Sequence, residues 1–151
     1  MYNTILVPLD GSKRAERILS HVEELARRLQ ARIVFLQVVE PTYDVMDPHG
    51  TVMDINIELM EKREREAETY LAGLQGEFED RGIQTRTFVE KGPVVNTIIQ
   101  VAEREGVDLI AMASHGRTGL SRVFYGSVAA GVLHQVDRPL LLIRAVDYAM
   151  S

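Results

Sequence analysis

The segment 113–119 contains the residue types that bind phosphate in α/β proteins. It follows an apolar run, 107–111, which we expect to be a buried strand, and Gly126 and Ser127 come shortly after it. Small residues let backbone N–H groups approach an anion, and the start of a following helix adds a positive dipole end. Ser127 could cap that helix and offer its hydroxyl to the same anion. Together these features favour a nucleotide site over ordinary turn glycines with an ordinary helix cap.

Charged residues near this loop add to the prediction. Arg117 and Arg122 could neutralise a polyphosphate, although they could also be two exposed cations on a turn. Asp10 follows the first apolar run and could accept hydrogen bonds from a ribose or help to hold a phosphate-bound divalent ion. It could equally cap a helix that starts near Ser12. His115 is expected to contribute a backbone N–H or a neutral contact, because no serine–histidine–acid order accompanies it.

Composition limits the class of protein. The chain has 151 residues, a formal net charge of −5 and no cysteine. We therefore expect one domain, 1–151, without disulfides, thiolate catalysis or cysteine-bound zinc. The acidic balance argues against a nucleic-acid or anionic-membrane partner. The N-terminus lacks the features of a secretory signal, and no apolar run is long enough to span a membrane, so a cytoplasmic location is expected.

Five apolar runs alternate with helical patterns, and these elements must position the loops. The runs are 5–7, 33–39, 85–89, 109–112 and 140–143; the helical segments are about 13–30, 56–81, 94–105 and 127–136. This alternation predicts an α/β fold: an open five-stranded parallel sheet in the order 3-2-1-4-5, with helices on both faces. The stretch 40–54 reads as an irregular connection, either a lid or a disordered surface loop.

The expected strand order brings two unusual loops together. Ligands of open parallel sheets bind beyond the carboxyl ends of the strands, where the strand order reverses. Here the reversal falls between the first and fourth strands, so the loops 8–12 and 113–117 should lie side by side. Val38, at the end of the second strand, is either where a flat apolar base would pack or a plain core valine.

These residues resemble the universal stress protein family, in its nucleotide-binding branch. The resemblance runs from the opening 5–12 to the final run 138–143. The ATP motif of that family is a glycine, two residues, a second glycine, nine residues, and a third glycine followed by serine or threonine. Gly116 occupies the second glycine position, nine residues (117–125) separate it from Gly126, and Ser127 follows. Ala113 stands at the first glycine position, where alanine is small but less free to adopt a positive φ.

The resemblance implies an adenine nucleotide site, with ATP as the expected ligand and Mg or Mn possible beside its phosphates. Asp10 would lie near the ribose or the metal, Val38 would contact adenine, and Gly126 would help to hold phosphate. Arg117 and Gly119 fall within the nine-residue spacer and are included with them. The implied set is Pro8, Leu9, Asp10, Val38, Met112, Ala113, His115, Gly116, Arg117, Gly119, Gly126, Ser127 and Val128.

The last strand suggests a partner. It lies at an edge of the expected sheet, yet Leu140, Leu141, Leu142 and Ile143 are all apolar. An exposed apolar edge promotes aggregation unless it is paired, so we expect a twofold homodimer through this strand, as the family often forms. The opposite edge, 85–87, is charged and β-branched, as exposed edges tend to be.

The sequence therefore predicts a cytoplasmic, homodimeric, ATP-binding universal stress protein that acts as a nucleotide-dependent sensor or regulator through an unknown protein partner. Two alternatives stay open at this stage. One is a slow metal-dependent ATPase that uses Asp10, and the other is an interaction domain without nucleotide. The sequence leaves AMP or a cyclic nucleotide open beside ATP.

Overall fold

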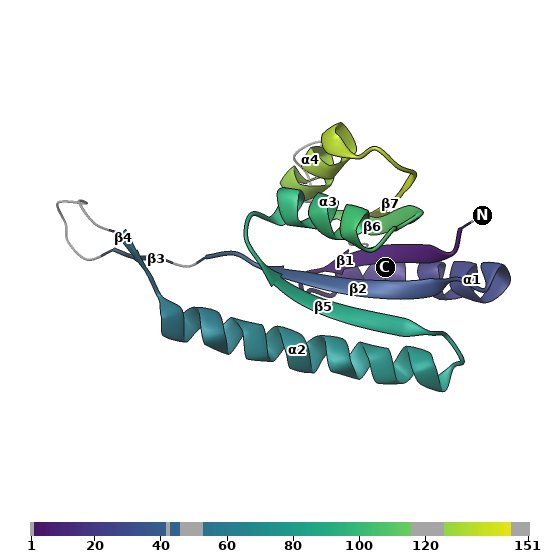
Figure 1. The fold of residues 1–151 in the computed structure, drawn as a ribbon, viewed down its shortest axis with the longest axis horizontal. Helices are drawn as coiled ribbons and strands as arrows, with labels where there is room; N and C mark the ends of the chain where they lie inside the picture. Colours follow the sequence, from purple (N-terminus) through teal and green to yellow (C-terminus); the bar gives the residue numbers. More distant parts are fainter. Residues whose placement is uncertain (1, 42, 46–52, 116–125, 146–151) are drawn as a thin grey trace, which may run out of the picture.

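Five strands form one parallel sheet (Figure 1). The computed structural model describes residues 2–41, 43–45, 53–115 and 126–145. Across the sheet the strands are β5 (Thr85–Lys91), β2 (Arg32–Val39), β1 (Thr4–Leu9), β6 (Leu109–His115) and β7 (Leu140–Ala145). In terms of the five expected runs this order is 3-2-1-4-5, so the predicted sheet is confirmed.

Helices cover both faces of this sheet, as expected. One face carries the 3-10 turn η1 (Ala15–Ile18), α1 (Leu19–Leu29) and α2 (Ile57–Asp80); the other carries α3 (Val94–Arg104) and α4 (Ser127–Gln135). The expected helix 13–30 thus starts with a tighter turn, and the other three agree with expectation to within two residues. None of the helices in the described part of the chain is long and apolar enough to cross a membrane.

The apolar strands have a core on each side. In β1, Ile5 and Val7 point into a cluster with α1 and α2, whereas Leu6 points into a second cluster with α3 and α4. All three are fully buried. Alternate strand residues face opposite sides, so a sheet covered on both faces needs apolar residues at every position. This requirement explains why the central strands lack polar alternation.

The connection 40–54 was expected to be irregular, but part of it forms regular structure. It contains a short antiparallel pair, β3 (Tyr43–Val45) and β4 (Met53–Ile55), in which Tyr43 is opposite Ile55. Figure 1 shows this pair beyond the end of the main sheet, next to the start of α2. Strands of three residues are too short for a period of two to be recognised in a sequence.

The two helices on the second face approach closely at Gly131 of α4. A Cβ atom on Gly131 would lie 2.7 Å from Cγ2 of Val95, in the first turn of α3. Val95 is β-branched and has little rotamer freedom in a helix, so it cannot easily move aside. The absence of a side chain at Gly131 therefore sets the spacing of α3 and α4.

We expect Gly131→Ala to destabilise the fold by about 1–3 kcal/mol, because the added methyl group overpacks this contact. Gly73→Ala is the matched control: a Cβ there meets nothing within 4 Å, so alanine should stabilise α2 by about 0.5–1 kcal/mol. Urea unfolding measures both changes. The packing explanation fails if both variants gain stability, or if Val95→Ala recovers nothing in the Gly131→Ala background.

Candidate functional site

A largely apolar cavity of about 180 Å³ opens at the carboxyl ends of β1, β2 and β6. This is the crevice beside the reversal of strand order, between β1 and β6. Seven of the residues expected at a nucleotide site line it together: Pro8, Leu9, Asp10, Val38, Met112, Ala113 and Val128.

The cavity also has walls that the sequence interpretation missed. They are contributed by Ala15, Leu36, Glu40, Val94, Ile98 and Ala129. Val94 and Ile98 lie one turn apart on α3, and Ala129 lies in the first turn of α4. The sequence predicted the two helices, but it did not show that both of them reach the end of the sheet.

Asp10 is held in a local turn. Its Oδ1 accepts a hydrogen bond from the backbone N–H of Ser12 at 2.8 Å, and the Ser12 hydroxyl oxygen accepts one from the N–H of Ala15 at 3.1 Å. These bonds satisfy N–H groups at the start of η1. Asp10 thus closes a turn in the loop before η1, whose N-cap is Arg14, and is not itself the cap of the helix. Its carboxylate also borders the cavity, so closing this turn and the ligand role are compatible.

The start of α4 differs from expectation in one respect. Gly126, not Ser127, occupies the N-cap position, and among the described residues no side chain caps this helix. Ser127 is already the first helical residue and is exposed, so the prediction that it caps the helix is wrong. Gly126 has φ 84° and ψ 152°, a conformation that glycine adopts without strain. The uncapped N–H groups of this turn remain available for an anion.

The remaining loop residues are only partly placed. His115 is the last residue of β6 and is paired with Ala145 of β7. Gly116, Arg117 and Gly119 lie outside the described residues, as does Arg122.

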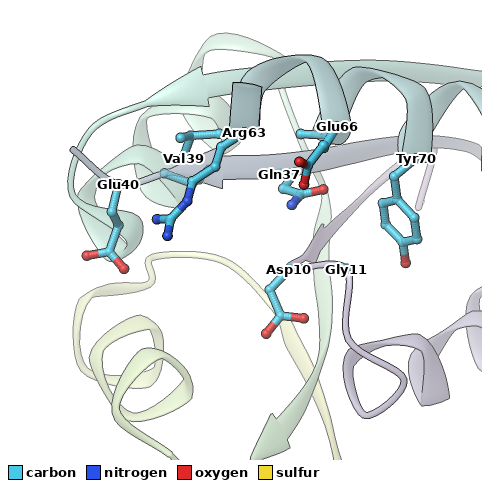
Figure 2. Close-up of a pocket in the computed structure, with 10 residues that line it drawn as sticks. Asp10, Gly11, Gln37, Val39, Glu40, Arg63, Glu66 and Tyr70 are labelled. Atoms are coloured by element: carbon cyan, nitrogen blue, oxygen red, sulfur yellow. The ribbon is translucent and has the colours of Figure 1, made fainter. Parts of the chain in front are cut away.

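A second, more polar cavity of about 530 Å³ lies between the same strand ends and α2 (Figure 2). Asp10, Val38 and Glu40 line both cavities. Arg63, Glu66 and Tyr70 of α2 complete the polar cavity. Nothing in the sequence alone connected α2 with the loop after the first strand.

Tyr70 attaches α2 to that loop. Its hydroxyl donates a hydrogen bond to Oε2 of Glu16 at 2.6 Å. Burial raises the pKa of the Tyr70 phenol far above its usual range, and the hydrogen bond and negative charge of Glu16 raise it further, with a smaller contribution from Asp10. The phenol is therefore neutral at any physiological pH and acts as a donor.

Metal binding at Asp10 would depend on other ligands. Within the described ranges, no group of three or more histidine, cysteine or carboxylate residues is arranged to hold a metal ion.

The fold is that of a Rossmann-like α/β protein with a cavity at the topological switch point. The model of the universal stress protein family matches residues 1–144, so the chain belongs to that family. Universal stress protein MJ0577 of Methanocaldococcus jannaschii is 30% identical, over 95% of this chain and 96% of its own length.

Solved structures of universal stress proteins have the same fold as this chain. The structure of MJ0577 matches with a TM-score of 0.77 and 28% identity over 95% of this chain and 96% of that one. Two more distant structures share the fold. One is a universal stress protein in complex with cAMP (TM-score 0.66, 17% identity, 96% and 98% coverage). The other, from Archaeoglobus fulgidus, is in complex with dAMP (TM-score 0.65, 19% identity, 94% and 98% coverage).

We expect Tyr70 to stay protonated at about pH 10.5, where ordinary tyrosines ionise. In the folded state, the tyrosinate absorbance of wild type and Tyr70→Phe should coincide; in denaturant, wild type should exceed the variant by one tyrosine. Because the pKa is raised in the folded state, the stabilisation is complete below about pH 10 and declines above it. A folded-state difference equal to one tyrosine at this pH would contradict the assignment.

Proposed function

We propose that this protein binds an adenine nucleotide, with ATP as the first candidate, in the apolar cavity at the ends of β1, β2 and β6. The observation that carries the proposal is the convergence on one cavity of residues 112 and 113 with Pro8, Asp10 and Val38. Strand ends far apart in the sequence thereby provide an apolar surface for a base and a carboxylate for a ribose.

The dimensions and polarity of the cavity suggest how the nucleotide would be oriented in it. A cavity of about 180 Å³ accommodates a base more readily than a whole nucleotide. Adenine would lie against Leu36, Val38 and Met112, and the ribose hydroxyls would donate hydrogen bonds to Asp10. The phosphates would extend towards Gly126 and Ser127, where the first turn of α4 presents its N–H groups. Mg or Mn bound to these phosphates could then reach Asp10.

The family supports this assignment at a coarser level. The fold holds an adenine nucleotide in the structures solved with cAMP and dAMP. Neither of those proteins is similar enough in sequence to select between ATP, AMP and a cyclic nucleotide here. ATP is favoured in this chain by the spacing of Gly116, Gly126 and Ser127.

The proposed role is that of a nucleotide-dependent regulator in the stress response, built from a single domain and located in the cytoplasm. Nucleotide would bridge the loop that follows β1 and the start of α4 and so change a surface that a protein partner recognises. Such a response requires different nucleotide affinities for the two states.

Titration calorimetry with ATP, AMP, cAMP and GTP tests the proposed site. Wild type should bind ATP, and Gly116→Val combined with Ser127→Ala should weaken binding about tenfold or more, because backbone approach and a hydroxyl donor are lost. Ser20→Ala, an exposed change on α1, is the control. Equal ATP affinities in wild type and the double variant would contradict the site, and GTP bound as tightly as ATP would contradict the adenine assignment.

We further propose that two copies associate through β7. In the described sheet β7 pairs with β6 on one side only, and Leu140, Leu141, Leu142 and Ile143 are only half-buried. An apolar edge of this kind is a ready template for another strand. If β7 paired with β7 of a second copy, the two sheets would form one continuous sheet related by a twofold axis.

Sedimentation equilibrium should give twice the chain mass for wild type. Leu141→Lys combined with Ile143→Lys should shift the mass to that of a monomer, since two charges would be brought into the joined edge. Thr87→Lys on the opposite edge strand β5 is the control and should leave a dimer. A monomeric wild type, or a dimer unaffected by the double change, would contradict this interface.

A further inference from the structure

The polar cavity beside α2 holds opposite charges that face one space without meeting. Arg63 reaches from α2 towards the strand ends that carry Glu40 and Asp10 (Figure 2). Among the described residues, neither Arg63 nor Glu40 forms an ion pair, whereas Glu66 lies 4.0 Å from Lys62. Within the described part of the chain, these two are therefore the lining charges that no ion pair engages.

The rest of the lining suits a small polar molecule. Gln37 places its side-chain amide at the cavity, while Val38, Val39 and Ala67 add short apolar surface. The Tyr70–Glu16 hydrogen bond holds α2 against the loop 10–16, so the walls come from elements that are attached to each other. The volume of about 530 Å³ is within the range of small-molecule sites, about 300–1,000 Å³.

The charges of the lining favour a ligand that carries both signs over a purely anionic or a purely cationic ligand. A phosphate or carboxylate alone would pair with Arg63 but would face Asp10, Glu40 and Glu66. An amine alone would satisfy the carboxylates but would leave Arg63 beside a second cation. A ligand that carries both signs a short distance apart meets both demands.

We propose that this cavity binds the zwitterionic ammonium–carboxylate group of a free α-amino acid. The guanidinium of Arg63 binds the carboxylate, and the carboxylate of Glu40 accepts the ammonium protons. The amino-acid side chain lies against Val39 and Ala67. The site adjoins the proposed nucleotide cavity through Asp10, Val38 and Glu40, but its ligand does not depend on a bound nucleotide.

The test screens the common L-amino acids, one at a time and at millimolar concentration, by saturation-transfer NMR on the full-length protein. The best binder is then compared with its methyl ester, which keeps only the positive charge, and its N-acetyl form, which keeps only the negative charge. We expect the free amino acid to bind about tenfold more tightly than either derivative, because each lacks one charge-assisted contact.

Arg63→Gln should reduce this affinity about tenfold or more. Arg65→Gln is the matched control: Arg65 is an exposed arginine of the same helix and does not line the cavity, so amino-acid affinity should be unchanged. The same Arg63→Gln protein is titrated with ATP, whose affinity should also be unchanged, which separates failure of this proposal from failure of the nucleotide site.

Three results would overturn the proposal. The first is no binding by any of the amino acids. The second is equal or tighter binding of the ester or the N-acetyl form, which would show that a single charge suffices. The third is an equal loss in the two arginine variants, which would show that the overall charge of α2, rather than this cavity, attracts the ligand.

Discussion

The burial of a parallel sheet on both faces is the constraint on which the rest of the structure depends. Since the side chains of β1 other than Pro8, and most of those of β2 and β6, are buried, the ligand space lies at the strand ends. The chain winds in opposite directions from β1, towards β2 and β5 on one side and towards β6 and β7 on the other. The carboxyl ends of β1 and β6 therefore border the crevice in which the apolar cavity lies.

The walls of that crevice are held by contacts from outside it. On one side, Gly131 lets α4 approach Val95 of α3, which brings Val94 and Ala129 to the same cavity. On the other side, Tyr70 bonds to Glu16 across the loop that carries Asp10. Three hydrogen bonds therefore hold this region: Asp10 to Ser12, Ser12 to Ala15 at the start of η1, and Glu16 to Tyr70 in the middle of α2. Such attachment favours preorganisation, in which ligand binding need not order the carboxylate first.

The two edge strands of the sheet differ in how far charged side chains cover their apolar surface. At the β5 edge, Arg86 of β5 and Arg104 of α3 lie over the ring of Phe88. Their guanidinium carbons are 5.1 Å and 4.9 Å from the ring centroid. Arg104 also bonds to Glu90 at 3.2 Å. Charged side chains thereby cover the apolar surface of this edge and discourage pairing with another strand. On β7 the described edge has no comparable cover, which is consistent with the proposed association of two copies there.

The sequence by itself determined the helices, the five main strands and their order, because hydrophobic periodicity and the right-handed crossover rule act locally or between consecutive elements. It also located Pro8, Asp10 and Ala113 near one another, since the carboxyl ends of neighbouring parallel strands must meet at one edge, and the family resemblance added Met112. Only the tertiary structure decided that Ile98 and Ala129 close the cavity, that Tyr70 reaches Glu16, that Gly126 rather than Ser127 occupies the N-cap position of α4, and that β3 pairs with β4. These features depend on where helices end and how closely they approach, and such distances are set by packing between residues far apart in the chain.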